Sequence, residues 1–199
     1  MTKRRSILLG PAVLLAALLS LAACASGPFR LMPIEPTAAP VHDSPLGLMG
    51  TYRTQSGRFE MDFPAAWSDA AGDDRRCQDA PKCLISRDSE FMLVRESKMV
   101  SRDGAPPSLA TELDAVVANF ANTTADAEFL ARTPFATDSG LEGEILEYRI
   151  ESGLVTVKEL WAADGAQAVS VAFITWNEGF PDMEPVADYV FSTVQPISR

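Results

Sequence analysis

The sequence predicts an α+β fold in which helices cover a mainly antiparallel sheet, as in an α/β/α sandwich. Three consecutive strand-like runs late in the chain are joined by Ser152-Gly153 and Asp164-Gly165, and such pairs are typical of antiparallel hairpin turns. One amphipathic helical pattern precedes these runs and another closes the chain. This grouping of strands and helices, without regular alternation, indicates an α+β fold.

The first two expected strands form a hairpin over residues 50–54 and 58–63. In the second strand, apolar side chains at every other position alternate with acidic ones, which predicts one buried and one exposed face. Pro64 ends this strand because proline cannot donate to a sheet. We expect Trp67 to pack over that end.

A polar stretch over residues 68–82 follows, with short strands expected at 83–86 and 91–96. The strongest helical pattern covers residues 109–122, where apolar residues recur every three or four positions. Ser108 directly precedes it and is a suitable N-cap. This segment therefore predicts one amphipathic helix.

The rest of the chain adds four strands and a second helix. The helix is expected to start at Pro181, a residue favoured in the first turn, and its apolar spacing continues to Val194. The four strands are expected at residues 127–132, 142–151, 154–163 and 167–176.

The first 23 residues resemble a secretion signal. Three basic residues at positions 3–5 precede an apolar run over residues 7–21. The sequence Leu21-Ala22-Ala23-Cys24 then resembles the lipobox of bacterial lipoproteins. This resemblance implies cleavage before Cys24 and a lipid anchor, with palmitate among its acyl chains, on the Cys24 thiol and amine. The alternative is an uncleaved anchor helix, but glycines and prolines make residues 6–29 a poor membrane span.

Residues 24–45 are expected to form a proline-rich tether, and residues 46–199 the folded domain. Five prolines and little apolar periodicity indicate an extended spacer, with a ligand for a proline-binding module as the alternative. The single histidine, His42, falls in the tether, so we expect no histidine-based catalysis in the domain. Ala25 stands where an aspartate would retain many lipoproteins in the inner membrane. It favours the outer membrane, with the domain facing the periplasm.

The chain is acidic, with 17 basic and 27 acidic residues and a net charge of -10. Loss of the three basic residues in the leader makes the mature form more acidic still. Such a surface repels nucleic acid and anionic lipid. We interpret the charges as a solvated surface, with a surface for cations or a basic partner as the alternative.

Cys77 and Cys83 remain once Cys24 is lipidated, and in an oxidising compartment we expect them to form a disulfide. Closing so short a loop stabilises the fold by roughly 2 kcal/mol. The alternatives are a redox pair, which normally has two intervening residues, and a metal site, which needs further ligands.

No motif in the sequence specifies a reaction: a nucleophile elbow, a Ser-x-x-Lys motif and a phosphate-binding glycine loop are all missing. Glu142, Glu144 and Glu147 are interpreted as surface charges. Trp161 and Trp176 lie on neighbouring expected strands and are interpreted as core residues, with sugar stacking or partner binding as the alternative. The sequence thus predicts a protein without enzymatic activity, cofactor or metal; a hydrolase with an unrecognised site is the alternative.

Residues 59–67, with the sequence FEMDFPAAW, are similar to the opening strand and Phe-Pro-x-x-Trp turn of the PsbP-like fold, which bacterial envelope proteins of the DcrB type share. The order of expected elements over residues 49–196 agrees with that fold. Its members are mostly binding or assembly factors without a common catalytic site. The resemblance implies a lipid-anchored envelope protein that binds or assembles a protein partner. A lipoprotein that binds a small ligand or a cation is the alternative.

Overall fold

In the computed structural model of the protein, the described residues are 41–70, 77, 80–86, 90–101, 106–123 and 127–198. The expected signal peptide, Cys24 and the tether up to residue 40 lie outside these ranges. Neither helix in the described ranges is both long and apolar enough to cross a bilayer.

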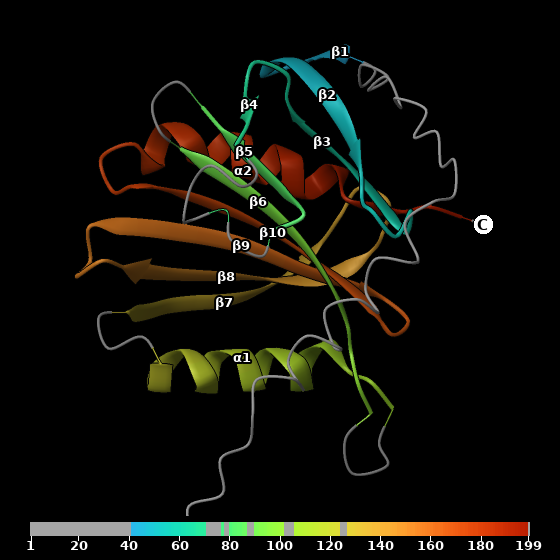
Figure 1. Ribbon diagram of the computed structural model, residues 1–199, viewed down its shortest axis with the longest axis vertical. Helices are drawn as coiled ribbons and strands as arrows, with labels where there is room; N and C mark the ends of the chain where they lie inside the picture. Colours follow the sequence, from blue (N-terminus) through green and yellow to red (C-terminus); the bar gives the residue numbers. More distant parts are fainter. Residues whose placement is uncertain are drawn as a thin grey trace, which may run out of the picture. The chain divides into compact units, whose positions relative to one another are not determined.

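A seven-stranded sheet forms the centre of the domain (Figure 1). Every neighbouring pair of its strands is antiparallel, which confirms the prediction of a mainly antiparallel sheet. In spatial order the strands are β4 (Ser68–Asp69), β5 (Lys82–Ile85), β6 (Phe91–Lys98), β10 (Gln167–Trp176), β9 (Val155–Asp164), β8 (Glu142–Ile150) and β7 (Glu128–Ala136).

A second, four-stranded antiparallel sheet joins the start of the domain to its end. Its order is β1 (Val41–Ser44), β2 (Gly47–Arg53), β3 (Phe59–Pro64) and β11 (Gln195–Pro196). The sequence predicts the β2–β3 hairpin but not the two outer strands. Both outer strands are very short, which limits the edge that they leave open to other chains.

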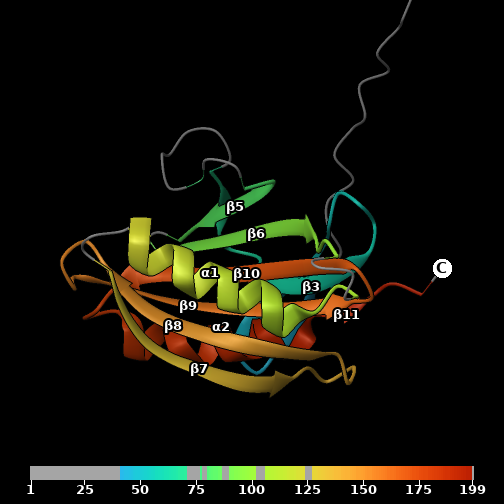
Figure 2. The same cartoon turned by 90° about the horizontal axis from the view of Figure 1, so that it is seen from below.

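The two helices, α1 (Leu109–Thr123) and α2 (Phe180–Thr193), lie on opposite faces of the seven-stranded sheet (Figure 2). Phe120 of α1 packs edge-on against Tyr148, whose partner in register on β9 is Val157. The next residue, Lys158, bonds to α2. Because neighbouring residues of a strand point to opposite faces, these contacts place the helices on opposite sides.

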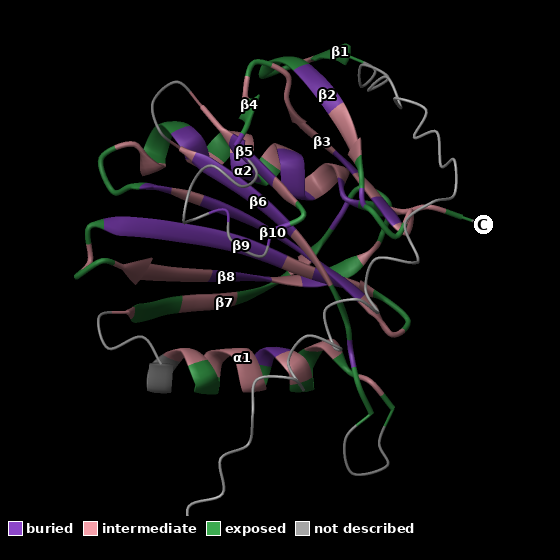
Figure 3. Ribbon diagram, in the orientation of Figure 1, coloured by how far each residue is buried: buried purple, intermediate pink, exposed green. Residues whose placement is uncertain are grey.

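The main hydrophobic core lies between the seven-stranded sheet, α2 and β3 (Figure 3). Phe173 on the central strand β10 and Phe191 on α2 meet edge to face there, with ring centroids 5.7 Å apart. A smaller cluster on the α1 side includes Cys77, Cys83 and Phe91. Because both faces of the central strands are covered, β10 is almost wholly buried, as Figure 3 shows.

The predicted boundary between tether and domain at residues 45 and 46 is wrong. Strand β1 begins at Val41 and pairs with β2 from Val41↔Gly50 to Ser44↔Gly47. The tight turn between these strands is closed by the Ser44 hydroxyl, and Gly47 takes a φ of 102° that favours glycine. The folded unit therefore includes His42, contrary to the expectation that this residue belongs to the tether.

Edge strand β7 extends beyond its predicted end at Arg132, to Ala136. It contains Pro134, which lacks an N–H, but an edge strand tolerates proline because one side of its backbone has no partner. The other expected strands and both expected helices are present in the structure. Helix α1 starts at Leu109, after Ser108, and Trp67 packs edge-on against Phe173 at 5.9 Å between centroids.

Candidate binding site

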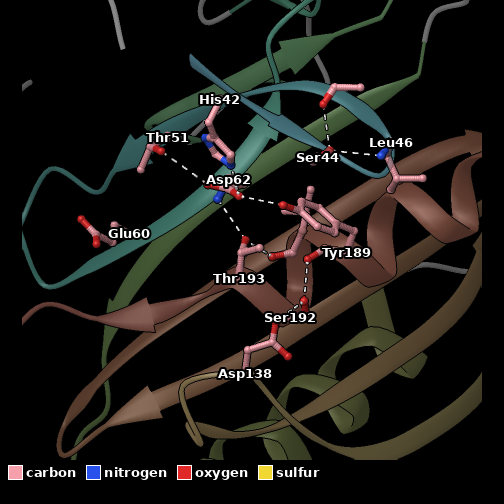
Figure 4. Close-up of polar contacts among 12 residues, drawn as sticks. His42, Ser44, Leu46, Thr51, Glu60, Asp62, Asp138, Tyr189, Ser192 and Thr193 are labelled. Carbon is pink, nitrogen blue, oxygen red and sulfur yellow. Dashed lines mark hydrogen bonds and ion pairs between the residues drawn. The ribbon is translucent and has the colours of Figure 1, made fainter. Parts of the chain in front are cut away.

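Asp62 on β3 is the centre of a polar cluster between the four-stranded sheet and α2 (Figure 4). Its carboxylate accepts hydrogen bonds from Thr51 Oγ1 at 3.4 Å and from the Tyr189 hydroxyl at 3.2 Å. Its backbone N–H donates to Thr193 Oγ1 at 3.0 Å. Burial raises the pKa of Tyr189, and the nearby Asp62 carboxylate raises it further. The cluster thus connects β2 and β3 to the second half of α2.

His42 joins this cluster from β1, with its Nε2 atom 2.9 Å from Asp62 Oδ2. A histidine–aspartate pair can serve acid–base chemistry if a nucleophile is within reach. The hydroxyl of Ser44, also on β1, is instead used in the turn: it donates to the Gly47 carbonyl and accepts from the Leu46 N–H. Among the contacts that the structure describes, the pair therefore connects strand β1 to strand β3.

A polar hollow of about 390 Å³ lies beside this cluster and contains three carboxylates, those of Glu60, Asp62 and Asp138. Each of them is already engaged within the protein. Glu60 bonds to Arg53 and Gln195, Asp62 is held as described above, and Asp138 accepts from the Ser192 hydroxyl at 2.9 Å. Within the described ranges, no group of three potential metal-ligating side chains is found. These three carboxylates are therefore part of the protein's own hydrogen-bond network.

An apolar groove of about 570 Å³ lies on the other side of the β1–β2 turn, against the start of α2. Leu46 and Leu48 are 43% and 60% exposed at its edge. Two carboxylates, Glu90 and Asp182, also line it. The remaining lining residues, which are apolar, are Met49, Pro64, Ala66, Trp67, Met183 and Val186.

The groove results from the turn that closes the β1–β2 hairpin. Ser44 fastens the turn, so Leu46 at its tip and Leu48 just after it are held outward. Trp67, the tryptophan of the predicted Phe-Pro-x-x-Trp turn, forms part of the wall while its ring edge contacts the core at Phe173. A fixed apolar surface with a rigid aromatic wall and an acidic rim is suited to receiving an apolar side chain from a partner.

Lys158 is a buried charge with carboxylate partners. Lys158, with a side chain only 6% exposed, donates to Asp188 at 2.7 Å and to Glu184 at 3.0 Å, and Glu147 lies 3.9 Å away. Burial lowers the pKa of Lys158, but the hydrogen bonds to Asp188 and Glu184 outweigh it and the pKa is raised. Glu144 accepts two hydrogen bonds from the Arg132 guanidinium group in a bidentate ion pair. Glu144 and Glu147, interpreted from the sequence as surface charges, therefore hold strands and helices together.

The two tryptophans interpreted as core residues have different environments. Trp176 is 47% exposed, so the prediction is wrong for this residue, which is the last residue of strand β10. Trp161 is partly buried, and its indole Nε1 has no hydrogen-bond partner among the described residues. Cys77 and Cys83 are joined as predicted, with Cα atoms 5.5 Å apart.

The polar cluster could have been partly foreseen. Val41-His42-Asp43-Ser44 followed by Pro45 and Gly47 has the form of a strand and a tight turn, but the density of prolines favoured a tether. The contact of His42 with Asp62 spans 20 residues and that of Asp62 with Tyr189 spans 127. No local pattern could have indicated the second of these contacts.

Comparison with known proteins shows that the fold of this domain is similar to that of solved structures. A scan of protein-family models finds no match, and no curated protein matches in sequence. The domain is similar to the solution structure of cyanobacterial PsbP (CyanoP) from Synechocystis sp. PCC 6803, with a TM-score of 0.55 at 15% identity. That match covers 86% of this chain and 100% of the other.

A second similar structure is LpqN of Mycobacterium tuberculosis, described as involved in cell envelope biogenesis. It has a TM-score of 0.53 at 12% identity, and the match covers 75% of this chain and 91% of the other. At such low identity these two likenesses establish the fold alone. They support the PsbP-like fold that the sequence resemblance implies.

Proposed function

We propose that this chain is a non-enzymatic lipoprotein of the cell envelope that binds a protein partner through its apolar groove. In this account acyl chains on Cys24 anchor it, and the domain faces the periplasm, with the outer membrane favoured by Ala25. The Leu21-Ala22-Ala23-Cys24 sequence supports the anchor. The fold shared with LpqN, a protein involved in cell envelope biogenesis, supports the location.

The anchor would keep the groove close to the membrane. Between Cys24 and the first strand at Val41 the chain has 16 residues, four of them prolines. A proline-rich chain extends by about 3.1 Å per residue, so the tether would hold the domain within about 50 Å of the lipid surface. Partners that project from the same membrane lie within this distance.

The exposure of Leu46 and Leu48 at the groove is the observation that carries the proposal. Full burial of a leucine side chain is worth about 1.5–3 kcal/mol, so a partner that covers both gains a substantial part of its binding energy there. The carboxylates of Glu90 and Asp182 select the chemistry of that partner. Together with the net charge of -10, they favour an apolar side chain flanked by lysine or arginine.

In-cell photo-crosslinking tests this proposal. A photoreactive phenylalanine analogue replaces Leu48 in the full chain, and the matched control replaces Val100, which is 58% exposed but lies outside the groove. We expect a discrete adduct with an envelope protein from position 48 and none from position 100. The charge variant Asp182→Lys should weaken that adduct. Equal labelling from both positions, or none from position 48, would overturn the proposed docking surface.

A further inference from the structure

The two helices are held to the seven-stranded sheet to different extents. Among residues 109–120 of α1, Leu113 alone is buried, and Figure 3 shows the rest of this part of the helix as half-buried or exposed. Helix α2 has a similar length but buries four residues: Met183, Ala187, Val190 and Phe191. Because burial of an apolar face supplies most of the energy that holds a helix in place, α1 should detach more easily than α2.

The packing beneath α1 is incomplete. A cavity of about 30 Å³ remains between the helix and the sheet. The helix contributes an apolar stripe to its wall, which consists of Val116, Val117 and Phe120, all of them half-buried. Side chains that border an empty space lose part of their van der Waals contacts. The stripe is therefore held less firmly than a fully packed interface would hold it.

The sheet side of the same cavity includes a carboxylate, that of Glu159 on β9. Glu159 is only 6% exposed, and its carboxylate accepts a hydrogen bond from the Tyr148 hydroxyl at 3.0 Å. Phe120 of α1 covers Tyr148, with ring centroids 4.6 Å apart. Burial of a carboxylate beneath an apolar stripe costs free energy, and contact with water recovers part of that cost. Displacement of α1 would provide that contact.

A single side chain, Arg132 on β7, connects the first half of α1 to the sheet. Its Nη1 atom donates to Asp114 Oδ1 at 2.6 Å, and its Nη2 atom donates to the Ala110 carbonyl at 3.4 Å. The same guanidinium group is paired with Glu144 on β8. Asp114 is exposed, so water can solvate its carboxylate when the bond to Arg132 breaks. This contact can therefore be made and broken at little cost.

We propose that α1 is a lid, which opens as a unit over Tyr148 and Glu159 while α2 and the two sheets stay folded. Opening breaks the Arg132–Asp114 bond, hydrates the Glu159 carboxylate and uncovers the apolar stripe. The lid lies on the face of the sheet opposite α2, whereas the apolar groove lies against α2 (Figure 2). Opening of α1 and docking of a partner at the groove can therefore each fail without the other.

Hydrogen exchange, followed by NMR on the purified full chain in detergent, tests the inference. We expect the amides of residues 113–120 in α1 to exchange at least about 100-fold faster than those of residues 187–193 in α2. Urea below the unfolding transition should accelerate exchange in α2 much more steeply than in α1, because local opening exposes little surface. Equal protection of the two helices, or an equal dependence on urea, would overturn the inference.

Three variants test what holds the lid closed. Arg132→Ala should speed exchange in α1 about threefold or more and leave α2 unchanged. The matched control Arg53→Ala breaks an exposed ion pair with Glu60 in the other sheet and should change neither helix. The double variant Tyr148→Phe/Glu159→Met replaces a buried polar pair by apolar side chains of similar shape, so exchange in α1 should slow about threefold or more.

The variants have outcomes that contradict the lid. Unchanged exchange in α1 of Arg132→Ala would overturn the inference, as would unchanged or faster exchange in α1 of Tyr148→Phe/Glu159→Met. If Arg132→Ala does not fold, the wild-type exchange profile and the double variant decide.

Discussion

His42 Nε2 lies 2.9 Å from Asp62 Oδ2, and this contact links strand β1 to strand β3. The two side chains differ in exposure, at 43% for His42 and 14% for Asp62. Asp62 also accepts hydrogen bonds from Thr51 and Tyr189. For His42, the described polar contact is the one with Asp62. The aspartate is therefore the more important member of the pair for stability.

We predict that Asp62→Ala destabilises the domain more than His42→Ala. Loss of the carboxylate leaves the Tyr189 hydroxyl without its acceptor and should cost about 1–3 kcal/mol. Loss of the half-exposed histidine should cost less than about 1 kcal/mol. Urea unfolding of both variants at neutral pH measures the difference, and an equal or reversed order would contradict the assigned roles.

The charge cluster at Lys158 should respond asymmetrically to substitution. The ammonium side chain is 6% exposed, but the Glu184 and Asp188 side chains are 45% and 51% exposed. The double variant Glu184→Gln/Asp188→Asn leaves a buried cation and should cost about 3 kcal/mol, whereas Lys158→Met leaves carboxylates that water can solvate and should cost about 1 kcal/mol. Chemical denaturation measures the free energy of unfolding of both variants. A larger loss of stability in Lys158→Met than in the double variant would contradict this prediction.

Alkaline pH should weaken the fold through Tyr148. Burial raises the pKa of Tyr148 well above its usual 10.0, and Glu159, which accepts its hydroxyl at 3.0 Å, raises it further. A group with a raised pKa contributes stability that is fully present below its unfolded pKa and is lost as the pH rises through the folded value. The loss should therefore begin above about pH 10.

The variant Tyr148→Phe isolates this effect. It should be less stable than the wild type at neutral pH, because Glu159 loses its hydrogen-bond donor, but its stability should fall less steeply above pH 10. Lys158, whose pKa is also raised, contributes an alkaline loss to both proteins and cancels in the comparison. Parallel stability curves for the two proteins between pH 9 and 12 would refute the titration of Tyr148.

The disulfide between Cys77 and Cys83 should stabilise the fold. The Cys77 and Cys83 side chains are buried in the smaller hydrophobic cluster. The double variant Cys77→Ala/Cys83→Ala should lose about 2 kcal/mol, the value expected for a loop of this length. Reductant should lower the denaturation midpoint of the wild type towards that of the variant and leave the variant unchanged. A reductant effect of the same size on both would show that the bond is not responsible.

Much of the fold was predictable because its strands and helices carry local patterns. The hairpins at Ser152-Gly153 and Asp164-Gly165 have turn residues that fix their registers, and α1 has apolar spacing that only a helix satisfies. Strand β1 was missed because its four residues are mostly polar and lie among prolines. This segment is a strand because it pairs with β2, and the strand propensities of its own residues do not predict that pairing.

The candidate sites were less predictable because they depend on contacts between distant segments. The exposure of Leu48 follows from the way the β1–β2 turn meets α2, about 130 residues later in the sequence. Glu159 could be placed on an expected strand, but not recognised as a carboxylate buried beneath α1. The disulfide and the lipid anchor could be predicted from the types and positions of a few residues alone.

The lipid on Cys24 is the claim from which the location, the oxidised cysteines and the membrane-proximal partner all follow. Growth of the producing bacterium with labelled palmitate measures it directly, with wild-type chain and Cys24→Ala compared after immunoprecipitation. We predict label in the wild type, none in Cys24→Ala, and release of the variant from the membrane fraction. An unlabelled wild-type protein, or equal labelling of the variant, would contradict the account.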